Sequence, residues 1–581
     1  MTSETPKNYI QSVLKTALEA LKLDTLIEKV DLSVPDVNFG HYSTNVALVL
    51  AKKAKQNPKE LAAKIVKKIE KIDAGQHIEK VEEKSGFINF VLTREFVAQQ
   101  ILRATDLNSV SIVADGSVPK KVLFEYSSPN TNKPLHIGHT RNDVYGMACI
   151  RLLRAVGYEV IASEVINDRG IHIMKSVLMY MLHGKNKTPE SEGVKPDHFV
   201  GKFYTMFAKK AAESPEVEQE LLEQAQQLLQ QWEAGDGAVH EVWKQMNEWE
   251  FVGMQQTYAK EGSVFDEVNY ESEIYNKGRE IVLEGVKHGV FTQEEDGSVS
   301  VDLTAEGLDK KYLLRKDGTT IYITQDLYLW YLRNKKHHPD IAIVTTAAEQ
   351  SYHFAVLKKL FELLQFPWAQ NFFHLPYEHV FLGHDKMSSR GGNTVSADEL
   401  LDLIKSKVRL VMSGLEKTKQ ETSNDVLIEQ VAFAAIKYGY LKYEPNTRIF
   451  FDTDQTIALD GNTGPYIQYA YSRIQSILQK AGSFTQMSPK DISEPEEILL
   501  MRQLLYYAET VALAAKEYKP NLLCNYLYEL ASQFSRFYNA VSVVNTENEI
   551  LKKQRLTLLD ATGQVLSDGL ALLGITAPPS M

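Results

Sequence analysis

The segment at residues 121–157 constrains the fold more than any other, because it joins a buried strand, a polar loop and a long apolar helix. Residues 121–126 form a short apolar run suited to a buried strand, and the Ser-Ser-Pro-Asn sequence that follows is typical of a turn. From Thr140 the apolar residues recur about every 3.6 positions, and Gly157 ends the predicted helix. Such a unit favours a doubly wound parallel sheet, which binds nucleotides at the carboxyl ends of its strands.

The loop of this unit carries groups suited to phosphate. A helix N-terminus offers unpaired N–H groups and the positive end of the helix dipole, which favour an anion such as a triphosphate. His136 and His139 flank the helix start, and Gly138 has no Cβ where backbone and ligand must approach closely. A loop with two histidines could simply pack or face water, but their place at a strand-to-helix turn favours nucleotide binding.

The His-Ile-Gly-His sequence at residues 136–139 resembles the first signature of class I aminoacyl-tRNA synthetases, and residues 125–142 resemble its arginyl-tRNA synthetase version. The resemblance extends over nearly the whole chain. It implies a multidomain α/β protein: a Rossmann-type doubly wound parallel sheet, a small α+β N-terminal domain and an all-α C-terminal bundle. It also implies an enzyme that activates L-arginine with ATP to arginyl-adenylate. The arginyl group is then transferred to the 3′-terminal ribose of tRNA(Arg), with release of pyrophosphate and AMP.

Length and composition are those of an ordinary multidomain protein. With 581 residues the chain is too long for one core, and 44% apolar and 24% charged residues are usual for globular proteins. No apolar run approaches the length of a membrane span and no signal peptide is recognisable, so we expect a cytoplasmic protein that does not bind membranes. Cys149 and Cys524 lack companions at metal-ligand spacing, so no metal or prosthetic group held by the protein is expected.

The net charge of −11 argues against a protein that binds nucleic acids non-specifically through a positively charged surface. Residues 1–110 nevertheless contain 16 Lys and Arg against 14 Asp and Glu, a net of +2. Lysines gathered at residues 52–71 could neutralise an RNA backbone, although a solvated helix face is the slightly simpler alternative. The resemblance favours RNA. It matches Phe39, His41 and Tyr42 to a turn that contacts the outer corner of the tRNA in arginyl-tRNA synthetases.

The expected elements divide the chain into four parts. We assign the N-terminal domain to 1–110, the catalytic domain with a helical insertion at about 185–300 to 118–395, connecting helices to 396–455 and the anticodon-binding domain to 456–581. Residues 159–166, 319–323 and 340–345 are expected as strands, and 258–289 as mostly helical. After residue 428 strand signals nearly vanish, and helices are expected at 433–443, 464–480, 497–516, 521–541 and 554–573.

Residues 382–392 resemble the lysine-rich second signature of class I synthetases, whose cations stabilise charge on the transferring adenylyl group. The match is imperfect, because Ser389 stands where the family usually has a second lysine. Arginyl enzymes often carry a lysine just ahead of the first signature, so we hypothesise that Lys133 supplies part of the missing charge. By resemblance the catalytic residues are His136, His139, Lys133 and Lys386, and the ATP-binding residues are His136, Gly138, His139, Lys386, Met387 and Ser388.

Charge also selects the amino acid. A guanidinium requires carboxylates and planar acceptors, among which bidentate pairs are the strong ones. The resemblance places Glu125 and Asn130 near the ammonium and carboxylate of the substrate, although each alone could be a cap or a local hydrogen bond. By resemblance the arginine-binding residues are Glu125, Ser127, Asn130, His139, Tyr322, Asp326 and Gln350.

The C-terminal part contains an Asn-rich loop followed by a tyrosine-rich helix, which could stack on unpaired bases. Aromatic helix faces are more often core, so some of these tyrosines are expected to be buried. With the Ser-Arg-Phe-Tyr sequence at 535–538, this part resembles the anticodon-binding domain of arginyl-tRNA synthetases. The implied tRNA-binding residues here are Asn462, Tyr466, Tyr469 and Arg473.

Three alternatives stay open at this point. A class I synthetase for another amino acid should show metal-binding cysteines, an editing insertion or cationic recognition groups, none of which the sequence suggests. A non-catalytic RNA-binding relative and a nucleotidyltransferase for small molecules are the other two. The preferred reaction needs no covalent enzyme intermediate, and its magnesium arrives bound to ATP. The resemblance also implies a monomer whose partners are tRNA(Arg), L-arginine and ATP.

Overall fold

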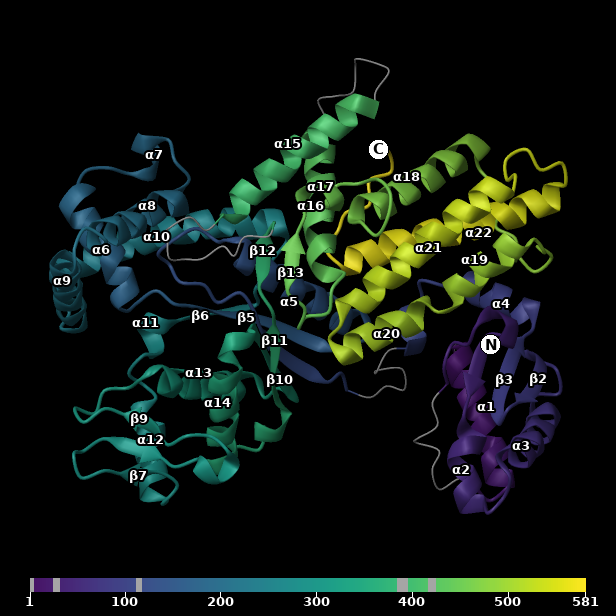
Figure 1. The fold of residues 1–581 in the computed structure, drawn as a ribbon, viewed down its shortest axis with the longest axis horizontal. Helices are drawn as coiled ribbons and strands as arrows, with labels where there is room; N and C mark the ends of the chain where they lie inside the picture. Colours follow the sequence, from purple (N-terminus) through teal and green to yellow (C-terminus); the bar gives the residue numbers. More distant parts are fainter. Residues whose placement is uncertain (1–4, 24–31, 111–117, 384–394, 416–424) are drawn as a thin grey trace.

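A central sheet organises the computed structural model, which describes residues 5–23, 32–110, 118–383, 395–415 and 425–581 (Figure 1). Within these residues the sheet has five parallel strands in the order β11-β10-β4-β5-β6. The order reverses between β4 and β10, which confirms the predicted doubly wound sheet and makes the carboxyl ends of these two strands the expected ligand crevice. The strands are β4 (Lys121–Glu125), β5 (Glu159–Ile166), β6 (Glu267–Tyr270), β10 (Ile341–Ala347) and β11 (Phe372–Tyr377).

Helices cover both faces of this sheet, because its central strands are apolar on both faces. Val122 and Phe124 pack in the same core as residues of α5, whereas Leu123 between them packs in the core formed with α13 and α14. Figure 1 shows α13 and α14 on the other side of the sheet from α5. These helices are α5 (Ile137–Ala155), α13 (Tyr322–His337) and α14 (Ser351–Leu363), and α6 (Ile171–His183) follows β5.

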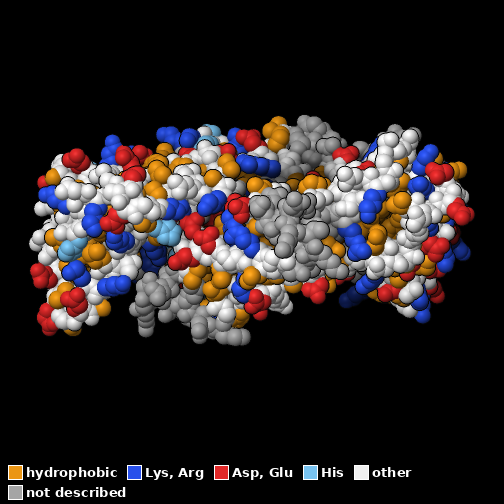
Figure 2. Space-filling model, turned by 90° about the horizontal axis from the view of Figure 1, so that it is seen from above, with side chains coloured by type: hydrophobic (Ala, Val, Ile, Leu, Met, Phe, Trp, Pro, Cys, Tyr) orange, Lys and Arg blue, Asp and Glu red, His pale blue; other side chains and the backbone are white. Residues whose placement is uncertain are grey.

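The N-terminal part has the predicted α+β character, with an antiparallel sheet in the order β1-β3-β2. Lys59, Lys64 and Lys67 lie on the exposed side of α3, whose apolar side is buried. On the face shown in Figure 2, basic side chains are interspersed with acidic ones, so no coat of a single sign is seen there. The elements are α1 (Pro6–Ala20), β1 (Tyr42–Thr44), α2 (Val46–Ala54), α3 (Pro58–Asp73), β2 (Ile78–Lys84), β3 (Phe87–Leu92) and α4 (Arg94–Ile101).

The polar residues after α6 form the predicted helical insertion. Its helices α8 and α9 begin with proline, whose missing N–H is not needed in the first turn. Together with α6 they enclose a core of their own around Phe199, Phe203 and Trp232. The insertion helices are α7 (Pro189–Glu192), α8 (Pro196–Ala211), α9 (Pro215–Glu233) and α10 (Gly237–Glu261).

Two predictions between residues 258 and 323 are wrong. The insertion is not helical up to residue 300, because residues 267–270 form the edge strand β6, which is too short and too polar to show alternation. Residues 319–323 are not a strand either, since Thr320 makes a single bridge to Leu314 and α13 already begins at Tyr322. The elements here are α11 (Glu271–Ile274), α12 (Arg279–Lys287) and the antiparallel strands β7 (Thr292–Gln293), β8 (Val299–Val301) and β9 (Lys311–Leu314).

The C-terminal part is the predicted helical bundle, apart from one short strand pair. Strand β12 (Val380–Leu382) runs parallel to β13 (Ile449–Phe451), so the chain that leads into the second signature is tied to the connecting helices. Figure 1 shows the bundle beside the N-terminal part, with α19 close to α4. The helices are α15 (Ala397–Leu415), α16 (Asp425–Leu441), α17 (Thr453–Thr456), α18 (Gly464–Ala481), α19 (Pro495–Leu505), α20 (Tyr507–Glu517), α21 (Pro520–Ala540) and α22 (Glu549–Leu572).

One segment in the described parts of the chain, Pro495–Glu517, is apolar and long enough to cross a membrane by length and composition alone. The sequence prediction that no run approaches that length is wrong for this segment. It consists of α19 and α20 with a break at Tyr506, and Leu500, Leu504 and Val511 are fully buried in the bundle core. Packing inside the bundle therefore accounts for its apolar character.

Candidate active site

The candidate site lies where β4 and β10 end and α5 begins. The side-chain amide of Asn142 on α5 joins the two strand ends, since its Nδ2 lies 3.5 Å from the Ser127 carbonyl and 3.2 Å from the Thr345 carbonyl. The loop between β4 and α5 is also held to the end of β5, because the Asn167 amide donates to the Ser128 carbonyl at 3.1 Å. The predicted convergence of strand ends is thus present as a connected framework.

The first signature caps its own helix. His136 is the N-cap of α5, and its Nδ1 accepts a hydrogen bond from the Gly138 N–H at 3.1 Å. In return the His136 N–H donates to Nδ1 of His139 at 3.1 Å, and the two rings stack with centroids 3.8 Å apart. A Cβ on Gly138 would lie 3.0 Å from Cε1 of His136. The glycine therefore makes room for the capping imidazole, a reason that the sequence did not suggest.

Both signature histidines are neutral at physiological pH. Burial and the nearby charge of Lys133 lower the pKa of His136 to about 4, and burial with the neighbouring His136 and Lys133 lowers the pKa of His139 further below its usual range. Since each Nδ1 accepts a backbone hydrogen bond, the ring proton of each neutral histidine is assigned to Nε2. The helix start therefore offers two imidazole N–H donors, with the partly buried ammonium of Lys133 beside them.

The loop after β4 is strained. Ser127 and Ser128 have φ angles of 65° and 55°, a left-handed conformation that costs a non-glycine residue about 1 to 3 kcal/mol. Their side chains help to hold this conformation, because Oγ of Ser127 is 2.9 Å from the Tyr258 hydroxyl and Oγ of Ser128 donates to Oε1 of Glu125 at 3.0 Å. The predicted substrate residue Ser127 is thus buried, and it shapes the loop rather than facing open solvent.

Glu125 is paired with a residue that sequence reasoning missed. Its Oε2 accepts a short, charged hydrogen bond from Nη1 of Arg333, whose side chain has no exposed surface. Arg333 follows Trp330 by three positions and so lies on the buried side of α13. An arginine at a buried helical position requires a buried partner, and this signal could have found the pair.

The remaining residues predicted to bind arginine are more open. Oδ2 of Asp326 lies 2.6 Å from Nε2 of His353, a partner that the sequence analysis did not assign. Tyr322 is 64% exposed, and Gln350 and Asn130 are also exposed. A ligand can therefore reach these side chains without displacing the core.

Residues 384–394 lie outside the described residues, and with them the predicted Lys386, Met387 and Ser388 as well as Ser389. The chain is described again from Val395, whose carbonyl accepts from the Ile137 N–H at 3.3 Å. Leu135 in turn accepts from the Ala397 N–H at 2.8 Å. The segment that follows the second signature thus pairs directly with the first signature.

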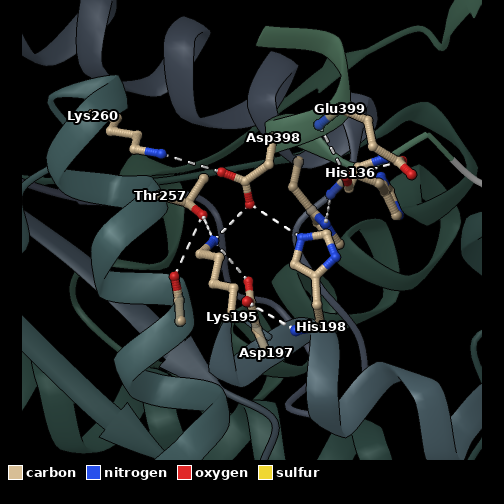
Figure 3. Close-up of polar contacts among 11 residues, drawn as sticks. His136, Lys195, Asp197, His198, Thr257, Lys260, Asp398 and Glu399 are labelled. Carbon is tan, nitrogen blue, oxygen red and sulfur yellow. Dashed lines mark hydrogen bonds and ion pairs between the residues drawn. The ribbon is translucent and has the colours of Figure 1, made fainter. Parts of the chain in front are cut away.

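A charged cluster fastens the start of α15 to the insertion (Figure 3). Asp398 lies 2.7 Å from Nζ of Lys195 and 3.2 Å from Nε2 of His198, and this hydrogen bond raises the pKa of His198. Among the described residues, Asp197, His198 and Asp398 have the spacing of metal ligands. The ammonium of Lys195, 3.0 Å from Asp197 and 2.7 Å from Asp398, already fills the cation position between them.

The predicted tRNA residues of the N-terminal part lie where it meets the bundle. Tyr42 is fully buried and its hydroxyl donates to Glu509 at 2.6 Å, so it joins the two parts and offers RNA no surface. The RNA contact predicted for Tyr42 stays a prediction, and this burial argues against it. His41 is half-buried, its Nδ1 accepts from the Leu92 N–H at 3.1 Å, and burial lowers its pKa to about 4. Phe39 is partly exposed under the ammonium of Lys84.

The predicted tRNA residues of the bundle differ in exposure. Tyr469 is 40% exposed, and the guanidinium of Arg473 lies 4.1 Å from the ring centre of Tyr538. The Asn462 side chain accepts from the Tyr438 hydroxyl at 2.5 Å, and the Tyr466 hydroxyl is 3.2 Å from Oγ of Ser535. Tyr469 is thus the most accessible of the four, and the other three are half-buried.

Comparison with known proteins identifies all three parts of the chain. The family model for tRNA synthetases class I (R), catalytic domain, matches residues 102–453. The arginyl tRNA synthetase N terminal domain matches residues 8–92, and the DALR anticodon binding domain matches residues 467–581. The catalytic match alone covers more than half of the chain.

Whole-chain relatives and solved structures agree. The arginine-tRNA ligase of Flavobacterium psychrophilum is 36% identical over 98% of each chain, and that of Bacteroides thetaiotaomicron is 37% identical over 97% of this chain and 98% of its own. In fold the chain is similar to Thermus thermophilus arginyl-tRNA synthetase, with a TM-score of 0.84, 24% identity and coverage of 99% and 100%. The chain belongs to the arginyl-tRNA synthetase family of class I tRNA synthetases.

Proposed function

We propose that this enzyme activates L-arginine with magnesium-bound ATP in the crevice between β4 and β10, and transfers the arginyl group to tRNA(Arg). The observation that carries the proposal is the gathering of donors for phosphate at the start of α5, next to Glu125 at the end of β4. We assign Asp326 on α13, a second carboxylate suited to a cationic amino acid, to the same crevice.

The triphosphate is assigned to the start of α5. The Nε2–H groups of His136 and His139 and the dipole of the helix favour phosphate oxygens, while Lys133 supplies positive charge. Lys386, Met387 and Ser388 of the second signature are assigned to the same ATP. Magnesium enters with the nucleotide and shares the neutralisation of its charge.

Arginine is assigned to lie along the crevice. Its guanidinium is assigned to Asp326 at the open end, with Tyr322 and Gln350, and its ammonium to Glu125 and Asn130. The substrate carboxylate is then free to attack the α-phosphorus of ATP, and the bond to pyrophosphate breaks. In the second step the terminal ribose hydroxyl of the tRNA attacks the arginyl carbonyl and AMP leaves. Positioning and charge stabilisation suffice for both steps without a covalent enzyme intermediate.

The tRNA is proposed to contact both ends of the molecule. Phe39 and His41 are assigned to its outer corner, and Asn462, Tyr466, Tyr469 and Arg473 to its unpaired bases. We further propose that the enzyme acts as a monomer in the cytoplasm and that bound tRNA promotes arginine activation.

The direct test is ATP-pyrophosphate exchange with each of the twenty amino acids, with and without total tRNA. Exchange with arginine alone, stronger when tRNA is present, is the expected result. Exchange with a different amino acid would replace arginine as the substrate. No exchange under any condition, despite intact tRNA binding, would favour the non-catalytic relative.

A further inference from the structure

The guanidinium of Arg333 holds three strands of the sheet together. Its Nη1 donates to Glu125 on β4, its Nη2 donates to the Glu164 carbonyl on β5 at 3.0 Å, and its Nε donates to Oδ1 of Asn269 on β6 at 2.8 Å. The side chain has no exposed surface. Because a guanidinium stays charged at any physiological pH and its fork is rigid, these bonds fix one position and one charge beneath the crevice.

Glu125 is consequently held on both oxygens. Arg333 occupies Oε2, and the hydroxyl of Ser128, itself fixed in a left-handed conformation, donates to Oε1 at 3.0 Å. An ionised carboxylate accepts about four hydrogen bonds, so lone pairs on Glu125 are left for a ligand in the crevice. The carboxylate is thus oriented before a substrate arrives, which lowers the entropy cost of binding.

Arg333 also acts on a second buried carboxyl nearby. Burial raises the pKa of Glu164 to about 8, while Arg333 opposes this rise and Glu125 adds to it. Without the guanidinium, Glu125 would lose the donor that holds Oε2 and the positive charge beside it. Its carboxylate would then be free to turn away from a cationic ligand.

We propose that Arg333 is a positioning residue for the α-ammonium group of the substrate: by holding the Glu125 carboxylate in place, it makes the enzyme distinguish an α-amino acid from the same molecule without its amino group. This inference rests on the proposed function. The alternative is that Arg333 only stabilises the fold, as many buried ion pairs do, and then its loss weakens every ligand equally.

The experiment uses equilibrium dialysis to measure the affinities of two ligands, L-arginine and 5-guanidinopentanoate. The second ligand is arginine without its amino group. Both are measured with tRNA present, on the full-length wild type, R333K and R333M. We expect the wild type to prefer L-arginine by about 10- to 100-fold, the value of one charged hydrogen bond. R333M should reduce this preference to less than about threefold, and R333K, which keeps the charge without the fork, should lie between the two.

Two further variants separate positioning from folding. Arg555 in the bundle is also buried and paired, with Nε donating to Glu497 at 2.6 Å, so R555K is the matched control and should leave both affinities unchanged. E125Q should lose the preference as R333M does, and R333M should have no further effect on the preference in an E125Q background. If R333M fails to fold, R333K decides the question.

The outcomes distinguish the inference from the function on which it rests. A wild type that does not bind L-arginine overturns the proposed function and the inference with it. A wild type that binds both ligands equally leaves arginine binding standing but overturns the inference. The inference is also overturned if the wild type prefers L-arginine and R333K or R333M keeps that preference unchanged while weakening both ligands.

Discussion

Glu125 and Asp326, the two carboxylates that we assign to the substrate, have partners that differ in kind. Glu125 is buried and paired with the guanidinium of Arg333, whose charge is permanent. Asp326 is 33% exposed and paired with the imidazole of His353, which is 26% exposed. Glu125 is therefore fixed before a ligand arrives, whereas Asp326 keeps a partner that a ligand can replace.

This difference suggests a division of labour along the substrate. A carboxylate with a permanent internal partner stays oriented, which suits the ammonium that every amino acid carries. A carboxylate with an exchangeable partner can give up the imidazole for a guanidinium, which forms two parallel hydrogen bonds where the imidazole forms one. Amino-acid selection is then expected to depend mainly on Asp326.

The largest effect is expected for Asp326→Asn. Losing the charged, bidentate pair should lower kcat/KM for arginine in pyrophosphate exchange by about 100-fold or more, with little change in the KM for ATP. The matched control is Asp340→Asn, because Asp340 lies at the opposite end of β10, where its carboxylate accepts from the Lys121 N–H at 2.8 Å. A drop of less than fivefold in the Asp326 variant would contradict the proposed division.

Lys133→Ala tests whether this partly buried cation also binds the phosphates of ATP. The pKa of Lys133 is lowered by burial, and its charge is close enough to depress the pKa values of His136 and His139. Removing a charge that stabilises the transferring group should lower kcat for pyrophosphate exchange by about 10- to 100-fold. Lys358→Ala is the control, since this lysine on α14 donates to the Phe372 carbonyl on β11 at 3.0 Å. Activation of arginine at the normal rate would remove Lys133 from the mechanism.

His353→Ala tests the exchangeable partner and should have a moderate effect. The guanidinium no longer has to displace a hydrogen bond worth about 1 kcal/mol, so the KM for arginine should fall about fivefold while kcat is nearly unchanged. His337→Ala is the control, because His337 is also paired with a carboxylate, that of Glu267, but on β6. If the KM for arginine is unchanged or rises in the His353 variant, the imidazole is not a partner that the substrate replaces.

Sequence predicted the site best where its contacts are local. His136 and His139 are neighbours in the chain, so a motif of four residues was enough to place them at the start of α5, although it did not show that they cap the helix. The pair of Glu125 and Arg333 spans 208 positions and leaves only a buried arginine on a helix as its signal. The buried Tyr42 reaches Glu509 across 467 positions and has no local signal at all. Partners that meet only after the parts assemble were therefore missed.

The smallest effect expected is on the pH dependence of stability, where two histidines should act in opposite directions. Beside His353, burial and the charge of His353 lower the pKa of His374 to about 4, although a hydrogen bond with Thr346 opposes this shift. A lowered pKa means that the unfolded chain takes up the proton first, so His374 costs stability as the pH falls from about 6.5 to 4. The hydrogen bond with Asp398 instead raises the pKa of His198, so its contribution is present at acid pH and is lost as the pH rises.

We compare how far the apparent melting temperature of each protein falls between pH 7.5 and pH 5. The fall should be about 2 °C smaller for His374→Gln than for the wild type, and about 2 °C larger for His198→Gln. Thermal unfolding of the three proteins at a series of pH values measures this. The two variants serve as controls for each other, because a general loss of packing lowers both curves at every pH. If both variants deviate from the wild type in the same direction on acidification, Asp398 does not stabilise the proton on His198. The contacts between α8 and α15 are then not stabilised by this charge pair.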